Sequence, residues 1–420
     1  MSELLALLDG REVGTVRHER GRLSFVYADA WRSAPGAYPL SLSMPLAAAK
    51  HPHAAIAPFF WGLLPDNEFV LTRWAQRFHV SARNAFALMS HVGEDCAGAV
   101  QFVAPERRDE LVSAPPAETE WLTEADVAGR LRALQADASA WRAPRDAGQF
   151  SLAGAQPKTA LLFDGQRWGV PSGRTPTTHI LKPPTGGLDG HAENEHLCLA
   201  LARALGLPTA NSQVRQFENV TAIVVERYDR VRVAATRIRR VHQEDFCQAL
   251  RVHPSLKYQN EGGPGPKQII GLLRANAQED DISAFLGALI LNWLIGGTDA
   301  HGKNYSILIG AGGLVRLAPL YDVASILAYP DFDLKKAKLA MKIGGEYRLR
   351  DIGFSEWRKC AADVRVDGDA LVGRARDMAA ELPDRLADEV RNLRDAGLAH
   401  AIIPTLADVL SKRAGLLARV

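Results

Sequence analysis

The longest uncharged stretch of this chain lies between Asp281 and Asp299 and has to be buried. It contains Asn292 and three glycines and falls slightly short of a comfortable membrane span, so we expect a core helix over Ile282–Ile295. A helix that is apolar on all sides needs a large core around it. A chain of 420 residues can supply one as two or three packed units.

Composition and charge are those of a globular protein outside the membrane. The hydrophobic fraction is 47% and the formal net charge is only +2, which gives no reason to expect nucleic-acid binding by the chain itself. Four scattered cysteines fit neither a disulfide framework nor a structural zinc site. The apolar run Leu4–Leu8 ends at Asp9 without a preceding basic region, so we expect a strand rather than a signal peptide, and a cytoplasmic protein.

Apolar periodicity changes along the chain from strand-like to helical. Short strands are predicted at Thr159–Phe163, Trp168–Val170, Thr178–Leu181 and Ala222–Val225. Helices are predicted at Trp121–Trp141, Ala192–Leu205, Gln243–Leu250 and Lys267–Asn276. This order predicts an α+β, bilobal, protein-kinase-like fold with a small sheet-rich N-terminal subdomain and lobe and a helical C-terminal lobe, although other two-lobed enzymes share it.

The corresponding division of the chain has four parts. We expect an N-terminal subdomain over residues 1–104, a linker and helix over 105–148, an N-lobe core with a phosphate loop over 149–235, and a helical C-lobe over 236–420. The linker is predicted from the polar, proline-containing segment Pro105–Glu120.

The strongest chemical signal follows the apolar helix directly. Asp299 and Asn304 have the spacing Asp-x-x-x-x-Asn. Phosphoryl transfer needs a carboxylate that orients the attacking hydroxyl and accepts its proton, and an oxygen nearby that holds Mg²⁺ against the phosphates. His301 lies between them without a second His or Cys at ligand spacing, which favours a positioning or packing role over metal ligation.

A hairpin is predicted to bring Asp322 to the same place. Tyr305–Ile309 and Leu314–Leu320 are predicted as its strands, with a glycine-rich turn between them. The residues that flank the open end of a hairpin lie close together, so Asn304 and Asp322 are expected to converge on one metal ion. Taken singly, each aspartate is more often an ordinary turn residue, and only the combination favours a site.

Three further segments are candidates for nucleotide contacts. The small-residue loop that starts at Ser151 and ends at Lys158 can bring backbone amides close to phosphate, although it lacks the Walker spacing and by itself is more often a turn. Lys182 ends a predicted strand and can reach phosphates, with Glu193 or Glu195 as its ion-pair partner. The segment Val224–Arg230 has the position of a hinge that binds adenine, or is an edge strand with solvated charges.

These segments, taken together with others, resemble the HipA family of serine/threonine kinase toxins of bacterial type II toxin–antitoxin systems. The resemblance is continuous along the chain and rests on specific strings of residues. They are Pro39–Leu46, Gly62–Asn67, Ser151–Thr159, Thr175–Lys182, Glu226–Arg230, Gln243–Asp245, Gly262–Gly265 and Thr298–Asn304.

The resemblance implies a role for each candidate residue. Asp299 is implied as the catalytic base, and Asn304 and Asp322 as Mg²⁺ ligands. The implied ATP contacts are Ala153, Gly154, Ala155, Gln156, Pro157, Lys158, Lys182, Glu226, Arg227, Tyr228, His301, Gly302, Lys303, Asn304, Tyr321 and Asp322. Pro157 stands where the family usually has an acidic residue, and the proline stiffens the loop.

The resemblance also implies regulation and partners. Ser151 matches the serine that family members autophosphorylate, which expels the phosphate loop and silences the kinase. The implied substrate is an aminoacyl-tRNA synthetase, such as glutamyl-tRNA synthetase, with growth arrest and persistence as the outcome. A HipB-like antitoxin is the implied partner and contacts DNA, so that this chain meets DNA mainly through that complex.

Two other kinds of function fit the same residues. The fold can transfer AMP or phosphorylate a small molecule, which the mass of the product distinguishes. A non-catalytic antitoxin-binding regulator is the second alternative, and the presence of Asp299, Asn304 and Asp322 together argues against it.

Overall fold

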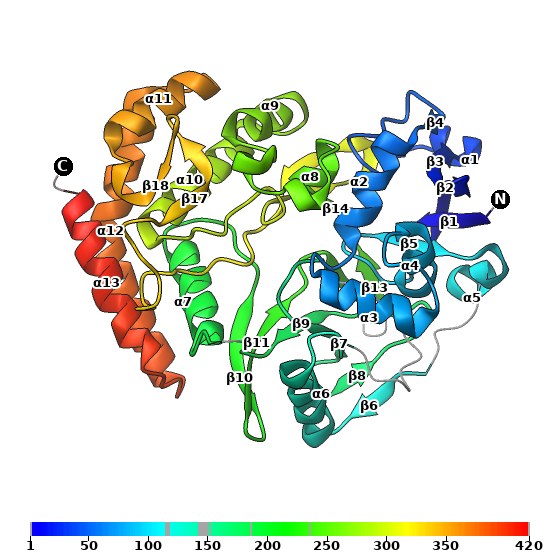
Figure 1. Ribbon diagram of the computed structural model, residues 1–420, viewed down its shortest axis with the longest axis horizontal. Helices are drawn as coiled ribbons and strands as arrows, with labels where there is room; N and C mark the ends of the chain where they lie inside the picture. The colour runs from blue at the N-terminus through cyan, green and yellow to red at the C-terminus, as the bar shows by residue number, and fades with distance from the viewer. Residues whose placement is uncertain are drawn as a thin grey trace. The chain divides into compact units, whose positions relative to one another are not determined.

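The computed structural model describes residues 2–113, 118–141, 151, 153–184, 187–234 and 237–418, and the chain divides into two compact units (Figure 1). Unit 1 comprises Met1–Pro183, Arg215–Ser255 and Ser306–Val315. Unit 2 comprises Pro184–Val214, Leu256–Tyr305 and Arg316–Val420. Each unit is assembled from segments that are far apart in sequence.

Unit 1 begins with an antiparallel sheet in the order β4-β3-β2-β1-β5. Its strands are β1 (Ser2–Leu8), β2 (Arg11–Glu19), β3 (Arg22–Tyr27), β4 (Lys50–His51) and β5 (Val100–Val103). In β3, Leu23, Phe25 and Tyr27 are buried and alternate with less buried residues, as expected for a sheet with one face on a core. The predicted strand at Leu4–Leu8 is confirmed.

Short helices cover this sheet. They are α1 (Asp29–Arg32), α2 (His53–Leu63), α3 (Glu68–Phe78) and α4 (Ala85–Val92). Phe59 and Phe60 of α2 are fully buried and share a core with Phe25 of β3. The predicted linker contains regular structure, because η1 (Pro105–Arg107) and α5 (Arg108–Val112) follow β5 and Leu111 packs in a small buried cluster.

The second sheet has the order β10-β11-β9-β7-β8-β6. Its strands are β6 (Glu120–Leu122), β7 (Thr159–Phe163), β8 (Trp168–Val170), β9 (His179–Lys182), β10 (Ser212–Phe217) and β11 (Val220–Glu226). Helix α6 (Glu124–Ala136) packs its buried Val127 and Leu131 in one core with residues of β7, β9 and β11. The predicted strands are confirmed. The predicted amphipathic helix forms over Glu124–Ala136 only, because Trp121 and Leu122 pair in β6 instead.

The remaining strands of unit 1 correct one prediction. The segment Gln243–Leu250 is not one helix, because β14 (His242–Asp245) pairs with β15 (Ser306–Ile309) and only α8 (Phe246–Ala249) is helical. Asp245 caps α8 by accepting a hydrogen bond from the Gln248 amide at 2.9 Å, so the helix cannot extend further back. The hairpin of β12 (Arg230–Ala234) and β13 (Arg237–Arg240) precedes β14.

Unit 2 is mostly helical. Its helices are α7 (His191–Ala204), α9 (Pro266–Asn276), α10 (Glu279–Ile295), α11 (Phe354–Val364), α12 (Gly368–Asp395) and α13 (Ile402–Leu417). The long helices α12 and α13 lie side by side, and α7 packs against both (Figure 1). A small hairpin, β17 (Lys338–Ile343) and β18 (Glu346–Arg348), completes the unit together with η3 (Gln259–Glu261) and η5 (Leu349–Asp351).

Helix α10 is the core helix predicted from the uncharged stretch. Every residue from Phe285 to Ile295 is buried, and Trp293 is among the largest fully buried side chains of the protein. Within the part of the chain that the structure describes, no helix is both long enough and apolar enough to cross a membrane.

Candidate active site

Two glycines turn the chain out of α10 and into the loop that carries Asp299. Gly296 ends the helix in the left-handed conformation, with φ +66°. At Gly297 a Cβ atom would lie 2.1 Å from the side-chain oxygen of Asn292, so only glycine fits there. The side-chain nitrogen of Asn292 in turn donates to the hydroxyl of Tyr305 at 3.0 Å. The loop between the helix and Tyr305 therefore starts and ends at fixed points.

Asp299 has an exposed carboxylate with one oxygen held in place. Its side chain is 71% exposed. The Tyr258 hydroxyl donates a hydrogen bond to Asp299 Oδ1, and His301 Nε2 lies 4.0 Å from the same oxygen. Such a carboxylate is oriented by one donor and is still able to accept a proton from an incoming hydroxyl.

Asn304 is oriented by its own loop. Its side-chain nitrogen donates to the Asp299 carbonyl at 2.9 Å, and its backbone amide donates to the His301 carbonyl at 2.9 Å. Because the amide nitrogen is fixed on the backbone, the side-chain oxygen is the end of the amide that is presented to a ligand.

Asp322 belongs to a segment that is tied to the Asp299 loop. The hydroxyl of Tyr321, the preceding residue, donates to the Lys303 carbonyl at 2.7 Å. Lys303 precedes Asn304, so this hydrogen bond joins the two chain segments that carry the predicted ligands. Asp322 itself has φ +53°, a conformation that residues other than glycine adopt rarely and often at functional sites.

The predicted hairpin forms, but its second strand is shorter than expected. β16 (Val315–Leu317) follows η4 (Ala311–Gly313) and extends the sheet of β14 and β15. It ends five residues before Asp322, so the Tyr321 hydrogen bond and the backbone turn place Asp322 rather than the strand end. The ends of the two hairpin strands alone therefore do not bring Asp322 to Asn304.

The donor set of this loop fits Mg²⁺. An amide oxygen and a carboxylate are the hard oxygen donors that this ion prefers, and it usually takes few protein ligands beside phosphate and water. The described residues contain no group of three or more His, Cys, Asp or Glu that could hold a metal by itself. A magnesium ion held here would therefore depend on Asn304 and Asp322 together with nucleotide oxygens.

Tyr258 is a site residue that the sequence reasoning missed. It lies in a turn folded by the Gly262–Gly265 string, where the Gly263 amide donates to the Tyr258 carbonyl at 2.9 Å. At Gly263 a Cβ atom would lie 2.3 Å from the Leu256 carbonyl oxygen. The ring of Tyr258 packs edge-on against His301 at 4.9 Å between centroids. The glycine string after Tyr258 was the available signal.

We expect Tyr258→Phe to lower kcat by roughly tenfold, because the phenol would no longer orient the Asp299 carboxylate. The KM for ATP should stay close to that of the unchanged protein, since the ring still packs on His301. Steady-state kinetics with a peptide or protein acceptor checks this result. Tyr347→Phe, at a half-buried tyrosine elsewhere in unit 2, is the matched control.

The predicted phosphate loop lies in unit 1 and folds around its own lysine. Lys158 is buried and donates from Nζ to the Ala153 carbonyl at 2.8 Å. Gly154 has φ +102°, and a Cβ atom there would lie 2.7 Å from Lys158 Nζ. Glycine thus allows the loop to close over the ammonium group, and Leu152 lies outside the described residues.

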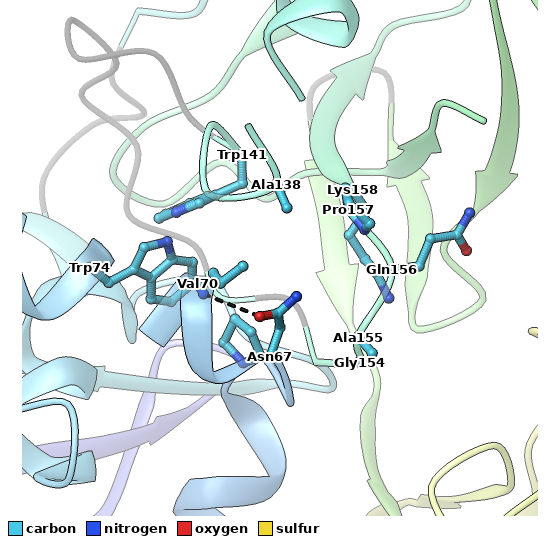
Figure 2. Close-up of a pocket in the computed structure, with 11 residues that line it drawn as sticks. Asn67, Val70, Trp74, Ala138, Trp141, Gly154, Ala155, Gln156, Pro157 and Lys158 are labelled. Atoms are coloured by element: carbon cyan, nitrogen blue, oxygen red, sulfur yellow. Dashed lines mark hydrogen bonds between the residues drawn. The ribbon is translucent and has the colours of Figure 1, made fainter. Parts of the chain in front are cut away.

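The loop forms one wall of a narrow pocket of about 20 Å³ (Figure 2). Trp74 of α3 and Trp141 form the opposite wall, with ring centroids 4.6 Å apart. The side chain of Gln156 points away from these two rings (Figure 2). On the Asn67 side, the Asp66 amide donates to the Gly154 carbonyl at 3.2 Å. The N-terminal subdomain therefore supports the loop directly.

Ser151 is fully buried at the start of this loop. Its hydroxyl donates to the Leu63 carbonyl at 2.6 Å, and its amide donates to the Asp95 carbonyl at 3.1 Å. These bonds, together with the Asp66–Gly154 contact, define what we call the loop seat. A kinase cannot reach the Ser151 hydroxyl while the loop occupies this seat.

Lys182 is the last residue of β9 and stands opposite Ile223 of β11. Its side chain is buried, so Lys182 is not a solvated surface lysine, which is the commoner situation for this residue type. Glu193 and Glu195, in the first two turns of α7 in unit 2, are both buried as well. Burial therefore does not distinguish between them as partners of Lys182.

The predicted hinge is anchored by a buried network of charges in unit 1. Arg227 donates to both carboxylate oxygens of Asp229, at 3.0 and 2.9 Å. Arg230 Nη2 lies 2.8 Å from Asp95 Oδ1, and Arg240 Nε lies 3.4 Å from the same oxygen. The backbone amide of Arg227 donates to the Thr178 carbonyl at 2.9 Å, so that amide is committed to the sheet.

Electrostatics keep this network ionised. Burial alone would raise the pKa of Asp95, but Arg230, Arg227 and Arg240 with the Thr177 hydroxyl hold it well below its usual value. Burial also disfavours the charged form of Arg230 and lowers the pKa of its guanidinium to about 10.

Arg227 and Asp229 flank Tyr228, whose hydroxyl donates to Gln243 Oε1. The side chain of Arg227 is thus structural, whereas Tyr228 and Glu226 remain at the surface of the segment.

Comparisons with known proteins cover almost the whole chain. Residues 4–103 match the HipA N-terminal domain, and residues 150–390 match the HipA-like C-terminal domain. "Putative kinase Y4mE" of Sinorhizobium fredii is 38% identical over 415 residues, which cover 97% of this chain and 96% of that protein. The serine/threonine-protein kinase toxin HipA of Shewanella oneidensis is 28% identical over 379 residues, covering 87% and 83%.

A solved structure shares the fold. The complex of Shewanella oneidensis HipA with HipB and its operator DNA contains a chain that matches with a TM-score of 0.83 and 24% identity, over 99% of both chains. The α+β, kinase-like fold predicted from the sequence is thereby confirmed. On the two domain matches and the full-length similarity to Y4mE, the chain belongs to the HipA family of serine/threonine protein kinases.

Proposed function

We propose that this kinase is the toxin of a type II toxin–antitoxin system, which phosphorylates an aminoacyl-tRNA synthetase such as glutamyl-tRNA synthetase and so arrests translation and growth. The observation that carries phosphotransfer is the arrangement of the Asp299 loop. It presents an exposed carboxylate oriented by Tyr258, beside an asparagine whose side-chain oxygen is directed outward by its own backbone contact.

In this proposal Asp299 accepts the proton of the substrate serine or threonine hydroxyl as the hydroxyl oxygen attacks the γ-phosphorus of ATP. The bond from that phosphorus to the β,γ-bridging oxygen breaks, and ADP leaves. Mg²⁺, held by Asn304 and Asp322, would neutralise phosphate charge. The backbone amides of the phosphate loop, Lys158 and Lys182 are the candidates for direct phosphate contacts. Glu226 and Tyr228 remain the candidates for adenine contacts.

Autophosphorylation of Ser151 is proposed from the family resemblance, and the loop seat supplies a physical reason why it would silence the kinase. The hydroxyl is buried, so the loop must leave its seat before phosphate can be transferred. A phosphoserine has no proton to donate to the Leu63 carbonyl, and it places nearly two negative charges against carbonyl oxygens. The phosphorylated loop therefore cannot return to the seat, and the phosphate contacts are lost.

The proposed partner is a HipB-like antitoxin. The Shewanella oneidensis relative is a HipA chain solved together with HipB and operator DNA. A net charge of only +2 supports DNA contact mainly through such a partner.

The test is incubation of the purified protein with γ-labelled ATP, Mg²⁺ and a panel of aminoacyl-tRNA synthetases. We expect label on a synthetase and on Ser151, located by mass spectrometry of tryptic peptides. A product that carries AMP, or a labelled small molecule only, would replace the proposal with one of the alternative transfer reactions. Nucleotide binding without any labelled product would indicate a regulator.

We expect Ser151→Ala to abolish self-labelling and to keep synthetase phosphorylation linear with time, because the loop can no longer be locked out of its seat. Progress curves with labelled ATP measure both. Ser255→Ala, at an exposed serine of unit 1, is the control and should decay like the unchanged protein. A Ser151→Ala curve that decays in the same way contradicts the proposed silencing.

A further inference from the structure

Unit 2 contains a second, larger cavity, which is not lined by Asp299, Asn304 or Asp322. Its volume is about 260 Å³. The turn after α7, the first turn of α10, the end of β16 with the residues that follow it, and Arg374 of α12 line it. At about 30 Å³ for each water molecule, this is room for roughly eight waters or a ligand of similar size.

Arg374 brings an uncompensated positive charge to this cavity. It is half-buried and donates from Nη1 to the side-chain oxygen of Ser283 at 2.9 Å and also to the Ser283 carbonyl. Among the residues that the structure describes, no Asp or Glu forms an ion pair with it. Burial lowers its pKa, and no acidic neighbour offsets that effect. A guanidinium desolvated in this way gains most from an added anion.

The position of Arg374 is built into the neighbouring helix. A Cβ atom at Gly287 of α10 would lie 2.3 Å from Arg374 Nη2. The guanidinium therefore lies against the α10 backbone in a space that only glycine leaves open. Its remaining N–H groups, on Nη2 and Nε, have no described hydrogen-bond acceptor.

Arg316 adds a second guanidinium to the same lining, and this one is fixed by an ion pair. Its Nε donates to both carboxylate oxygens of Asp281, at 3.1 and 3.0 Å. The amides of Leu317 and Gln278 also donate to Asp281, at 2.9 and 3.0 Å. The carboxylate is thus fully used by the protein, while the terminal nitrogens of Arg316 have no described partner. Its side chain is 47% exposed, so those nitrogens can reach a ligand.

The rest of the lining is mainly aliphatic and held by backbone hydrogen bonds. Leu207, Pro208 and Leu320 contribute apolar surface. The Leu320 amide donates to the Pro208 carbonyl at 2.8 Å, and the Ala210 amide donates to the Leu320 carbonyl at 2.8 Å. This wall is pre-formed, which favours binding of an aliphatic group.

We propose that this cavity is a binding site for a ligand with one carboxylate on a short aliphatic body. The carboxylate would pair with Arg374 and accept a further bond from Arg316, and the aliphatic body would lie on the wall of Leu207, Pro208 and Leu320. Asp281 already pairs with Arg316, so Arg374 leaves one positive charge for the ligand, and the exposed Asp280 at the same lining disfavours a doubly charged phosphate. This inference goes beyond the proposed kinase function and does not depend on it.

The site is tested with the full chain by isothermal titration and by ligand-observed NMR, using hexanoate, hexanol and hexyl phosphate as probes. We expect hexanoate to bind at least about tenfold more tightly than hexanol, as for a charge-assisted hydrogen bond. Equal affinity for hexanol would overturn the proposal even without any variant, and tighter binding of hexyl phosphate would reassign the site to phosphate esters. A peptide with a free or an amidated carboxyl terminus then separates a protein source of the carboxylate from a free fatty acid.

The Arg374→Gln variant locates the binding. It should weaken hexanoate about tenfold or more and leave hexanol unchanged. The control is Arg385→Gln, at an exposed arginine of the same helix that pairs with Glu381 at 3.4 Å, and it should bind like the unchanged protein. Loss of affinity in both variants, or in neither, contradicts the site. If Arg374→Lys weakens hexanoate binding in part, the planar guanidinium group contributes to recognition beyond its positive charge.

Discussion

Asp299→Ala is expected to lower the rate of phosphoryl transfer by roughly 10² to 10⁴ while ATP affinity changes little. The carboxylate is the group that accepts the proton of the attacking hydroxyl, and contributions of general bases are of this size. Single-turnover labelling with γ-labelled ATP measures the rate, and fluorescence titration with a nucleotide analogue measures the affinity.

The matched control is Asp331→Ala, at an exposed carboxylate in a turn of the same unit. It should keep the full rate. An Asp299→Ala variant that retains more than about a tenth of the rate would exclude Asp299 as the base, because a loss of that size is below the range for this role. The rate of phosphoryl transfer in Tyr258→Phe should lie between the rates of these two variants, since this substitution removes only the donor that orients Asp299.

Asp95→Ala is expected to destabilise unit 1 by roughly 3 to 5 kcal/mol, the usual result of leaving buried charges without their partner. Arg230 and Arg240 would lose their shared acceptor, and the Thr177 hydroxyl and amide would lose theirs as well. Urea unfolding followed by circular dichroism measures the change. The control, Glu381→Ala, breaks an exposed pair on α12 and should cost less than about 1 kcal/mol.

Protonation of Asp95 in acid should destabilise unit 1 in the same direction as Asp95→Ala. The folded-state pKa of Asp95 is lowered, and so is that of Asp229, where Arg227 and Arg230 outweigh the effect of burial. Their contribution to stability is therefore complete above the unfolded value of about 4 and is lost as the pH falls below it. Asp95→Ala should therefore make the free energy of unfolding depend less steeply on pH in the acid range. An unchanged slope in that range would show that other groups govern the loss of stability in acid.

Local pattern was enough to predict much of the fold. The uncharged stretch, the short runs bounded by Gly, Pro or Asp-Gly, and the Gly206 and Pro208 stop after α7 each act through neighbours in sequence. As a result α10, β7, β8 and α7 formed close to where they were predicted. Gln243–Asp245 was predicted wrongly, because its strand depends on pairing with Ser306–Ile309, some sixty residues away. A pairing of that kind has no signature in the local sequence.

The candidate site also combines contacts between neighbours in sequence, which could be predicted, with contacts between distant residues, which could not. Asp299 and Asn304 are five residues apart, so one loop contains both and the sequence spacing is informative. Tyr258 reaches Asp299 from 41 residues earlier, and Asp95 meets Arg230 from 135 residues earlier. Contacts across such separations depend on the packing of whole elements. For that reason the sequence did not show that the side chain of Arg227, in the predicted adenine hinge, belongs to a buried ion network.

Because Ser151 is buried, the opening of its loop would determine how long the kinase stays active before the proposed self-silencing. Modification requires a rare opening of the loop, so its rate is the product of the open fraction and the transfer rate. Each change of about 1.4 kcal/mol in the opening free energy alters that rate roughly tenfold. The bonds from Ser151 to Leu63 and Asp95 would therefore set how long a toxin molecule stays active, and substitutions far from any ATP contact could lengthen or shorten growth arrest.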